Sequence, residues 1–268
     1  MKSIGMAKTQ EIDFSISKEN LFKLIQTLKD LSKLDDQVLF KFDKKNTLLY
    51  SLVGEGQNVN AFKSFVYKTN ELFDIDDFEG TIMFIGKTSK GMARHLQIMS
   101  DFDIDTFKGK IYYDELGDEL FSDRIYFRSG NKLRQSFYGD DPRQMNTQIS
   151  VDKIKQFIKL EDADFSFDLT ASDFDKIKKL AAPDAEMNIF YMNTFERGGE
   201  NFVSIGEGSW ELTVAETDYS YPRTLAFPKK YFKTIGMIDG LAKIYVFDAS
   251  LMVSTPESDL LISIEVTI

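Results

Sequence analysis

The stretches "SLVGEGQNVNAF" (residues 51–62) and "VSIGEGSWELTV" (residues 203–214) share the tripeptide Gly-Glu-Gly, which begins at Gly54 and at Gly206. Each copy follows a short apolar run that is typical of a strand. Three interpretations are open: coincidence, a phosphate-binding loop, or the trace of a duplication that runs through the chain. The residues around each copy decide among them.

The chain around the first copy predicts one strand, one helix and three further strands. Residues 10–17 alternate as a strand does, and Ser17 is a plausible N-cap for a helix over 18–34. The apolar residues of that helix recur at helical spacing and are Leu21, Leu24, Ile25, Leu28 and Leu31. Strand-like runs follow at 37–42, 47–53 and 58–67. This order is the repeating unit.

The same order returns from about residues 80, 163 and 223, with helices expected at 87–99, 171–182 and 228–237. "IDFSIS…LFKLI" of the first unit aligns with "ADFSFDLT…FDKIK" of the third at nearly the offset of the two tripeptides. We therefore predict that the tripeptides mark equivalent strand ends in two duplicated α+β domains. These domains are residues 1–139 and 161–268, joined by a connector (140–160) with an extra helix at 150–159. Chance recurrence of strand–helix–strand order is the alternative.

Composition narrows the class of protein. The chain has 268 residues, 43% of them hydrophobic, and it has no cysteine, which excludes disulfides, thiolate nucleophiles and cysteine-ligated metals. Its start, "MKSIGMAKTQEI", lacks the apolar region of a signal peptide, and no apolar run approaches the roughly 20 residues that cross a bilayer. We expect a soluble cytoplasmic protein with no membrane partner.

Charge is unevenly distributed along the chain. The net charge is −10, yet the four predicted helices hold thirteen Lys and Arg against four Asp and Glu. Lysines on the outer face of a helix are usually only solvated, but two of these helices contain no acid at all. A basic surface on an acidic protein suits a phosphate backbone, which needs charge and no base-specific groups.

Three motifs could indicate a functional site, but each lacks a residue that such a site requires. "GKTSKG" (86–91) lacks the first glycine of a phosphate-binding loop, because Thr81 stands there. His95 is the only histidine, and without cysteine it makes neither a plausible zinc site nor a catalytic triad. "DFDIDTF" (101–107) lacks the glycine and the final glutamate of a calcium loop. We expect no enzyme activity, no metal and no cofactor.

A duplicated strand–helix–three-strand unit with basic helices resembles the DNA sliding clamps. "ADFSFDLTASDFDKIKKL" is similar to the start of a clamp domain, and "KKYFKTIG…AKIYVFD…LMVSTPESDLLISIEV" is similar to a clamp's final unit. The two-domain length matches the clamps of T-even-like phages and the proliferating-cell nuclear antigen family, with the phage type nearest. The resemblance covers nearly the whole chain but includes no short diagnostic motif.

The resemblance implies a DNA clamp fold and a homotrimeric ring around double-stranded DNA, with twelve helices lining the hole. It also implies a DNA polymerase partner, an ATP-dependent clamp loader and, for a phage protein, the host cytoplasm. The helix positions that would line the hole are Lys23, Lys29, Lys33, Lys87, Lys90, Arg94, Lys176, Lys179, Lys229, Lys230 and Lys233. The positions that match the family's pocket for partner peptides are Val53, Val59, Ala61, Met145, Ile149, Ala242 and Ile264.

Two other classes of protein stay open. A β-rich structural or ligand-binding protein, such as a virion component, would use its helical lysines only for solubility and would not bind DNA. An enzyme is the weakest option, because a single histidine and no cysteine leave no catalytic set.

Overall fold

A computed structural model of the chain describes residues 9–55, 58–116, 119–140, 159–181, 188–232, 234–235, 241–256, 258–263 and 265–267. It divides into two compact units. The first comprises Met1–Leu52 and Ser64–Asn146, and the second comprises Val53–Lys63 and Thr147–Ile268. The hairpin segment 53–63 therefore groups with the second unit, although the sequence analysis assigns it to the first domain. The helix expected at 150–159 falls almost entirely outside the described residues.

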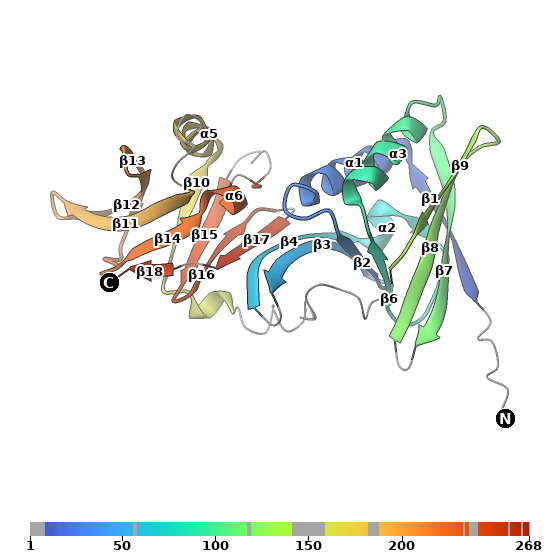
Figure 1. Cartoon of the computed structure of the whole chain (residues 1–268), viewed down its shortest axis with the longest axis horizontal. Helices are drawn as coiled ribbons and strands as arrows, with labels where there is room; N and C mark the ends of the chain where they lie inside the picture. The colour runs from blue at the N-terminus through green and yellow to red at the C-terminus, as the bar shows by residue number, and fades with distance from the viewer. Residues whose placement is uncertain are drawn as a thin grey trace. The chain divides into compact units, whose positions relative to one another are not determined.

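The first unit contains the predicted order of elements twice (Figure 1). The first pass consists of β1 (Gln10–Ser17), α1 (Lys18–Leu31), β2 (Val38–Phe42), β3 (Asn46–Glu55) and β4 (Asn58–Lys68). The second pass consists of β6 (Ile82–Gly86), α3 (Ser89–Ser100), β7 (Thr106–Leu116), β8 (Glu119–Ser129) and β9 (Leu133–Tyr138). Between them lie α2 (Thr69–Leu72) and β5 (Asp74–Ile75), which the sequence analysis did not predict.

The second unit contains the same order twice more. Its third pass consists of β10 (Phe165–Thr170), α5 (Ala171–Leu180), β11 (Ile189–Arg197), β12 (Glu200–Glu207) and β13 (Trp210–Thr217). The fourth consists of β14 (Thr224–Pro228), α6 (Lys229–Phe232), β15 (Leu241–Phe247), β16 (Ser250–Ser254), β17 (Ser258–Ser263) and β18 (Glu265–Thr267). A short 3-10 helix (Leu160–Asp162) precedes β10. Gly54 and Gly206 lie near the ends of β3 and β12, each the second strand after a helix, so the predicted equivalence of the tripeptides is confirmed.

The strands pair almost entirely antiparallel. In the first unit the order is β3–β2–β6–β8–β7–β1–β5, with β9 also paired to β8; among the pairs whose register is described there, β6 with β8 is the parallel one. In the second unit one sheet has the order β10–β15–β16–β17 and continues to the first residues of β4, which belong to that unit. Its other sheet has the order β13–β12–β11–β14–β18.

Each long helix buries one apolar stripe, and two of them, α1 and α5, begin with a side-chain cap. The Ser17 hydroxyl accepts a hydrogen bond from the Asn20 amide (3.2 Å), as predicted, and Thr170 caps α5 by accepting from the Asp173 amide (3.1 Å). All five predicted apolar residues of α1 are buried, and so are Met92, Leu96 and Met99 of α3. Burial of one stripe leaves the opposite side of each helix, which carries the lysines, to solvent.

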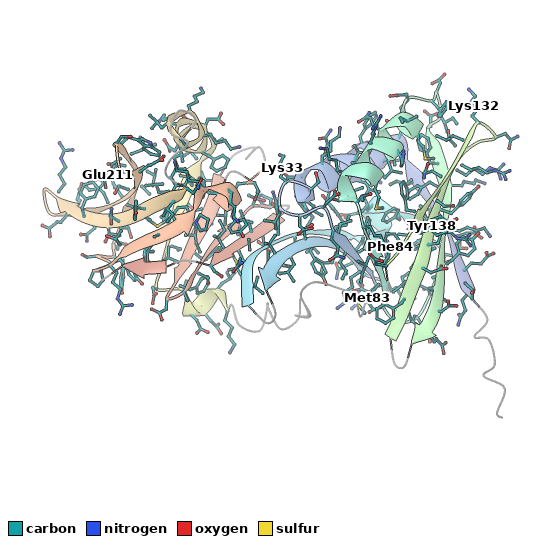
Figure 2. All side chains as sticks on the ribbon, viewed as in Figure 1. Lys33, Met83, Phe84, Lys132, Tyr138 and Glu211 are labelled. Atoms are coloured by element: carbon teal, nitrogen blue, oxygen red, sulfur yellow. The ribbon has the colours of Figure 1, made fainter. Side chains whose placement is uncertain are left out.

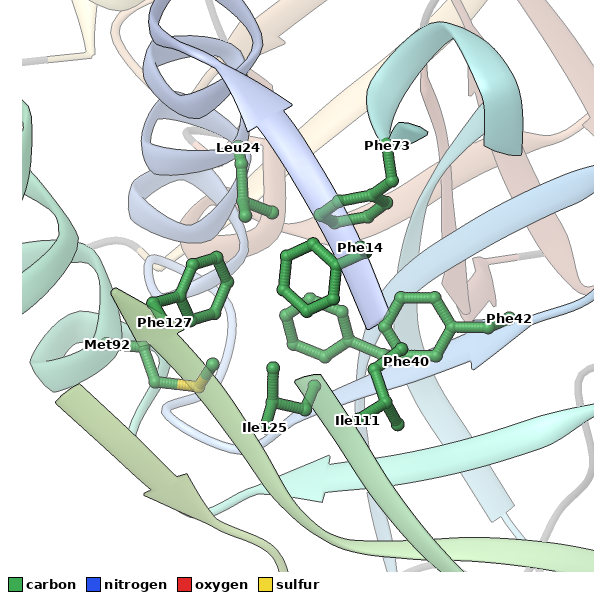
Figure 3. A pocket seen from close by; sticks show the side chains of 9 residues that line it. All are labelled: Phe14, Leu24, Phe40, Phe42, Phe73, Met92, Ile111, Ile125 and Phe127. Carbon is green, nitrogen blue, oxygen red and sulfur yellow. The ribbon is translucent and has the colours of Figure 1, made fainter. Parts of the chain in front are cut away.

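The core of the first unit is built on phenylalanine. Phe14 of β1 meets Phe73 and Phe127 edge to face, with ring centroids 5.3 and 5.2 Å apart. Nine apolar side chains, labelled in Figure 3, surround a gap of about 10 Å³ between them. So small a space is barely sufficient for one water and has no polar partner for it. It is a packing gap and no binding site.

Candidate nucleic-acid interface

The first unit presents basic side chains on the solvent side of α1 and α3. Lys23 and Lys29 of α1 are exposed, and so are Lys90 and Arg94 of α3. Figure 1 shows α1 and α3 together on one side of the strands of this unit, and the two helices contact each other along their length. The four cations therefore stand on the side of the helix pair that faces away from the buried stripes.

Two sets of hydrogen bonds fix the positions of these helices. Lys29 Nζ of α1 donates to Gln97 Oε1 of α3 (3.2 Å). The first amides of α3 bond to Asp36, just after α1: Ser89 N donates to the Asp36 carbonyl (2.6 Å) and Lys90 N to its Oδ1 (3.1 Å). The segment that follows α1 thus meets the start of α3.

Two further predicted lysines of this unit have acidic partners. Lys33 pairs with Asp30 (2.9 Å) and Lys87, just before α3, pairs with Asp140 (2.6 Å). Both lysine side chains are more than half exposed, at 53% and 63%. Exposed pairs of this kind contribute roughly 0–1 kcal/mol, so either ammonium can exchange its carboxylate for a phosphate at little cost.

In the second unit α5 carries two of the predicted cations on its exposed side, Lys176 and Lys179. Lys176 bonds Asp173 (2.9 Å). The Thr170 hydroxyl and then Lys176 hold the pKa of Asp173 below its usual value. Lys178 points elsewhere: it lies over the Phe174 ring at 4.3 Å and donates to the Ile235 carbonyl (3.2 Å).

The fourth helix corrects one prediction. Lys229 begins α6, but it is only 3% exposed and its Nζ donates to Glu207 Oε1, so it cannot reach DNA. A buried ammonium needs a paired carboxylate, and Glu207 of the second Gly-Glu-Gly supplies it. Helical spacing alone could not identify this, because α6 has only four residues. Lys230 is exposed, and Lys233 lies outside the described residues.

Four of the seven predicted partner-peptide positions lie within the described residues, and two of these four are closed to a partner. Ala61 and Ala242 are fully buried in the strands β4 and β15, so neither can face a partner peptide. Val53 and Val59 are half-buried. The remaining positions, Met145, Ile149 and Ile264, lie outside the described residues.

A different pocket of about 260 Å³ lies in the second unit. Its lining is Asn60, Ile189, Ala226, Phe227, Pro228, Lys230, Tyr231 and Ser263. Asn60 stands between two of the predicted positions, but the apolar walls come from the junction of β14 and α6. That junction, "FPKKYF", was expected to be the end of a strand and the start of the fourth helix, with no pocket. A pocket of this size accommodates one or two apolar side chains next to an ammonium.

The described ranges contain neither a metal-site cluster nor a membrane-spanning helix. Within them, no three His, Asp or Glu side chains are grouped so as to hold a metal ion. In the same ranges no helix has the length and apolar character that crossing a bilayer requires.

No protein-family model matches the sequence, and no curated protein matches it either. Solved structures do match. The DNA polymerase III subunit beta from Borrelia burgdorferi aligns with a TM-score of 0.64 and 12% identity, over 94% of this chain and 64% of that chain. The PCNA2–PCNA3 complex from Sulfolobus tokodaii aligns with a TM-score of 0.57 and 10% identity, over 94% of this chain and 99% of that chain.

The chain has the sliding-clamp fold. A third structure with this fold, the Helicobacter pylori beta clamp bound to a DNA ligase peptide, has a TM-score of 0.60 and 10% identity, over 94% of this chain and 66% of that chain. This chain thus spans just under two thirds of the length of these bacterial clamps and nearly all of the Sulfolobus chain. The predicted α+β class and clamp fold are confirmed, and identities this low carry the likeness no further than the fold.

Proposed function

We propose that this chain is a subunit of a DNA sliding clamp, a homotrimeric ring that encircles duplex DNA and tethers a replicative polymerase. One observation supports it above the others: exposed Lys and Arg occupy the solvent sides of α1, α3 and α5 on a chain of net charge −10. Such cations bind phosphates without reading bases, and weak sequence-independent contacts are what sliding requires. The fold needs no catalytic group for this role.

The DNA contact in this proposal uses the predicted cations except Lys229, which is buried, and Lys233, which lies outside the described residues. In the first unit they are Lys23, Lys29, Lys33, Lys87, Lys90 and Arg94, and in the second unit Lys176, Lys179 and Lys230. The acidic remainder of the chain repels DNA and so limits contact to these helices.

The ring in this proposal closes through two edge strands. Among the described strands, β9 pairs only with β8, and β13 pairs only with β12. Pairing β9 of one copy with β13 of the next is a head-to-tail contact, and such contacts form a ring when their rotation closes. It also removes two exposed edges, which would otherwise invite aggregation.

The partner-peptide site in this proposal is the pocket at the β14–α6 junction. The Helicobacter clamp that shares this fold binds a ligase peptide, and an apolar pocket beside Lys230 suits an apolar side chain next to an acidic group. A polymerase and an ATP-dependent loader are the partners we propose. Phage origin and a host-cytoplasm location stay predictions.

The test is retention on nicked circular DNA at low salt, measured by gel filtration after loading by incubation with excess protein. Lys90→Glu with Arg94→Glu should lower retention at least tenfold, because two cations become two anions. The matched control is Lys44→Glu with Lys68→Glu, which makes the same charge change at exposed lysines outside the helices. Equal retention of both variants would remove α3 from the interface. No retention of the wild-type protein at any salt would favour the structural-protein alternative.

A further inference from the structure

The second unit contains an acidic hollow of about 740 Å³ beside the edge strand β13. Three carboxylates line it, Glu200, Glu216 and Asp218, and its described lining has no Lys or Arg. Tyr219 also lines it, 42% exposed, with its ring stacked on Phe165 at 5.6 Å and 17°. Carboxylates beside an open aromatic face are the surroundings that favour a guanidinium or an ammonium group.

The first unit carries a row of cations that ends at the other edge strand, β9. Lys108 of β7 lies opposite Arg128 of β8, and Arg128 lies opposite Arg134 of β9. Like charges directly opposite each other destabilise a sheet, so this row gains from an acidic partner. Arg134 and Lys132 are exposed, and Lys132 stands at the tip of the β8–β9 hairpin (Figure 2).

We propose that the acidic hollow receives Arg134 and Lys132 from the β8–β9 hairpin of a second copy of this chain. This inference rests on the head-to-tail ring proposed above. It identifies the charged contact that favours the pairing of β9 of one copy with β13 of the next. The occupant is a second copy because the complementary charges occur on one chain, each beside a strand edge open to pairing.

The direction of pairing follows from where the charges stand along each strand. Arg134 lies near the start of β9, whereas Glu216 lies near the end of β13 and leads into Asp218 and Tyr219. Antiparallel pairing brings these two ends together. Parallel pairing would instead place Arg134 near Glu211, whose carboxylate already accepts a hydrogen bond from the Ser204 hydroxyl. Antiparallel pairing therefore matches the cations with the acids that line the hollow.

The test is a charge exchange, read by light scattering on a sizing column over a dilution series. Arg134→Glu alone and Glu216→Arg alone should each raise the concentration at which the trimer dissociates at least tenfold. Both changes in one chain should restore it to within about threefold of wild type, since each interface would again join opposite charges. Lys44→Glu, at an exposed turn lysine of the first unit, is the matched control and should leave assembly unchanged.

Misfolding is separated from loss of assembly by circular dichroism and thermal unfolding of each variant. Arg134→Glu places an acid opposite Arg128, so the monomer should be no less stable than wild type. Single variants that assemble normally, or a double variant that fails to recover, would overturn this inference and leave the ring intact. A wild-type chain that is monomeric at every concentration would overturn the proposed ring itself.

Discussion

Lys229 Nζ donates a hydrogen bond to Glu207 Oε1 inside the second unit, and the two side chains are only 4% and 1% exposed. Glu207 ends β12 and belongs to the second Gly-Glu-Gly, while Lys229 begins α6. The ammonium also lies over the Phe190 ring at 5.5 Å. The pair therefore ties the start of the fourth helix to the strand that precedes β13.

Removal of one member of this pair should be costly. Lys229→Met leaves the Glu207 carboxylate buried without its ammonium, and we expect the free energy of unfolding to fall by about 3–5 kcal/mol. Urea denaturation followed by circular dichroism measures it. Lys230→Met, one residue further and exposed, is the control and should change stability by less than about 0.5 kcal/mol. A Lys229→Met variant whose free energy of unfolding equals that of wild type would contradict the buried pairing.

Gly109 of β7 should tolerate no side chain. A methyl group there would collide with the Phe14 ring and would lie 2.6 Å from the Tyr126 carbonyl oxygen, which belongs to the neighbouring strand. Gly109→Ala should lower the free energy of unfolding by about 1–3 kcal/mol through overpacking. Lys108→Ala, at the exposed position next to it, is the comparison for thermal unfolding. Equal melting temperatures for the two variants would show that Phe14 does not lie against Gly109.

Asp173 should make the second unit sensitive to acid. Its pKa lies below the usual 3.8, first because of the Thr170 hydroxyl and then because of Lys176. A carboxylate with a lowered folded-state pKa stabilises the fold at pH values above 3.8 and loses that contribution as the pH falls through the folded-state pKa. Asp173→Asn should therefore be less stable than wild type at pH 7, and the difference should shrink below pH 3.8. If the stability difference between wild type and Asp173→Asn does not change with pH, the charge of Asp173 does not contribute to the stability of the fold.

The pocket at the β14–α6 junction can be blocked from its rim. Asn60 lines it and is exposed, so Asn60→Arg should fill its mouth without disturbing the core. We expect binding of a polymerase-derived peptide, measured by fluorescence anisotropy, to weaken at least tenfold. Val66→Arg, at an exposed position of the same strand, should bind the peptide as wild type does. If both variants bind alike, the peptide site lies elsewhere.

Long amphipathic elements were the part of the fold that the sequence predicted well. β1 and α1 have an apolar residue at each expected position, and Ser17 marks the boundary between them. The predicted bounds of β1 therefore agree with the structure, and α1 ends three residues before its predicted end. Short elements were missed. α2 and β5 have four and two residues, too few to show a period.

Candidate site residues followed the same division. On α1 and α3 the exposed side is opposite a long buried stripe, so periodicity placed Lys23 and Lys90 on the exposed side as the structure does. On α6 a four-residue helix offers no such stripe, and only the fold reveals that Lys229 turns inward to Glu207. The pocket is lined by residues of β4, β11, β14 and β17 together with α6. Periodicity along the sequence does not predict which of these distant segments lie together.

The measurement that tests the central claim most directly compares protein retained on a nicked circular DNA before and after a single cut linearises it. A ring that encircles DNA is held by topology, so we predict that cutting releases the protein at a salt concentration that leaves the circle occupied. Blocking both ends of the cut DNA with bulky adducts should restore retention. Equal retention on circular and linear DNA would contradict encirclement and would reduce the basic helices to an ordinary phosphate-binding surface.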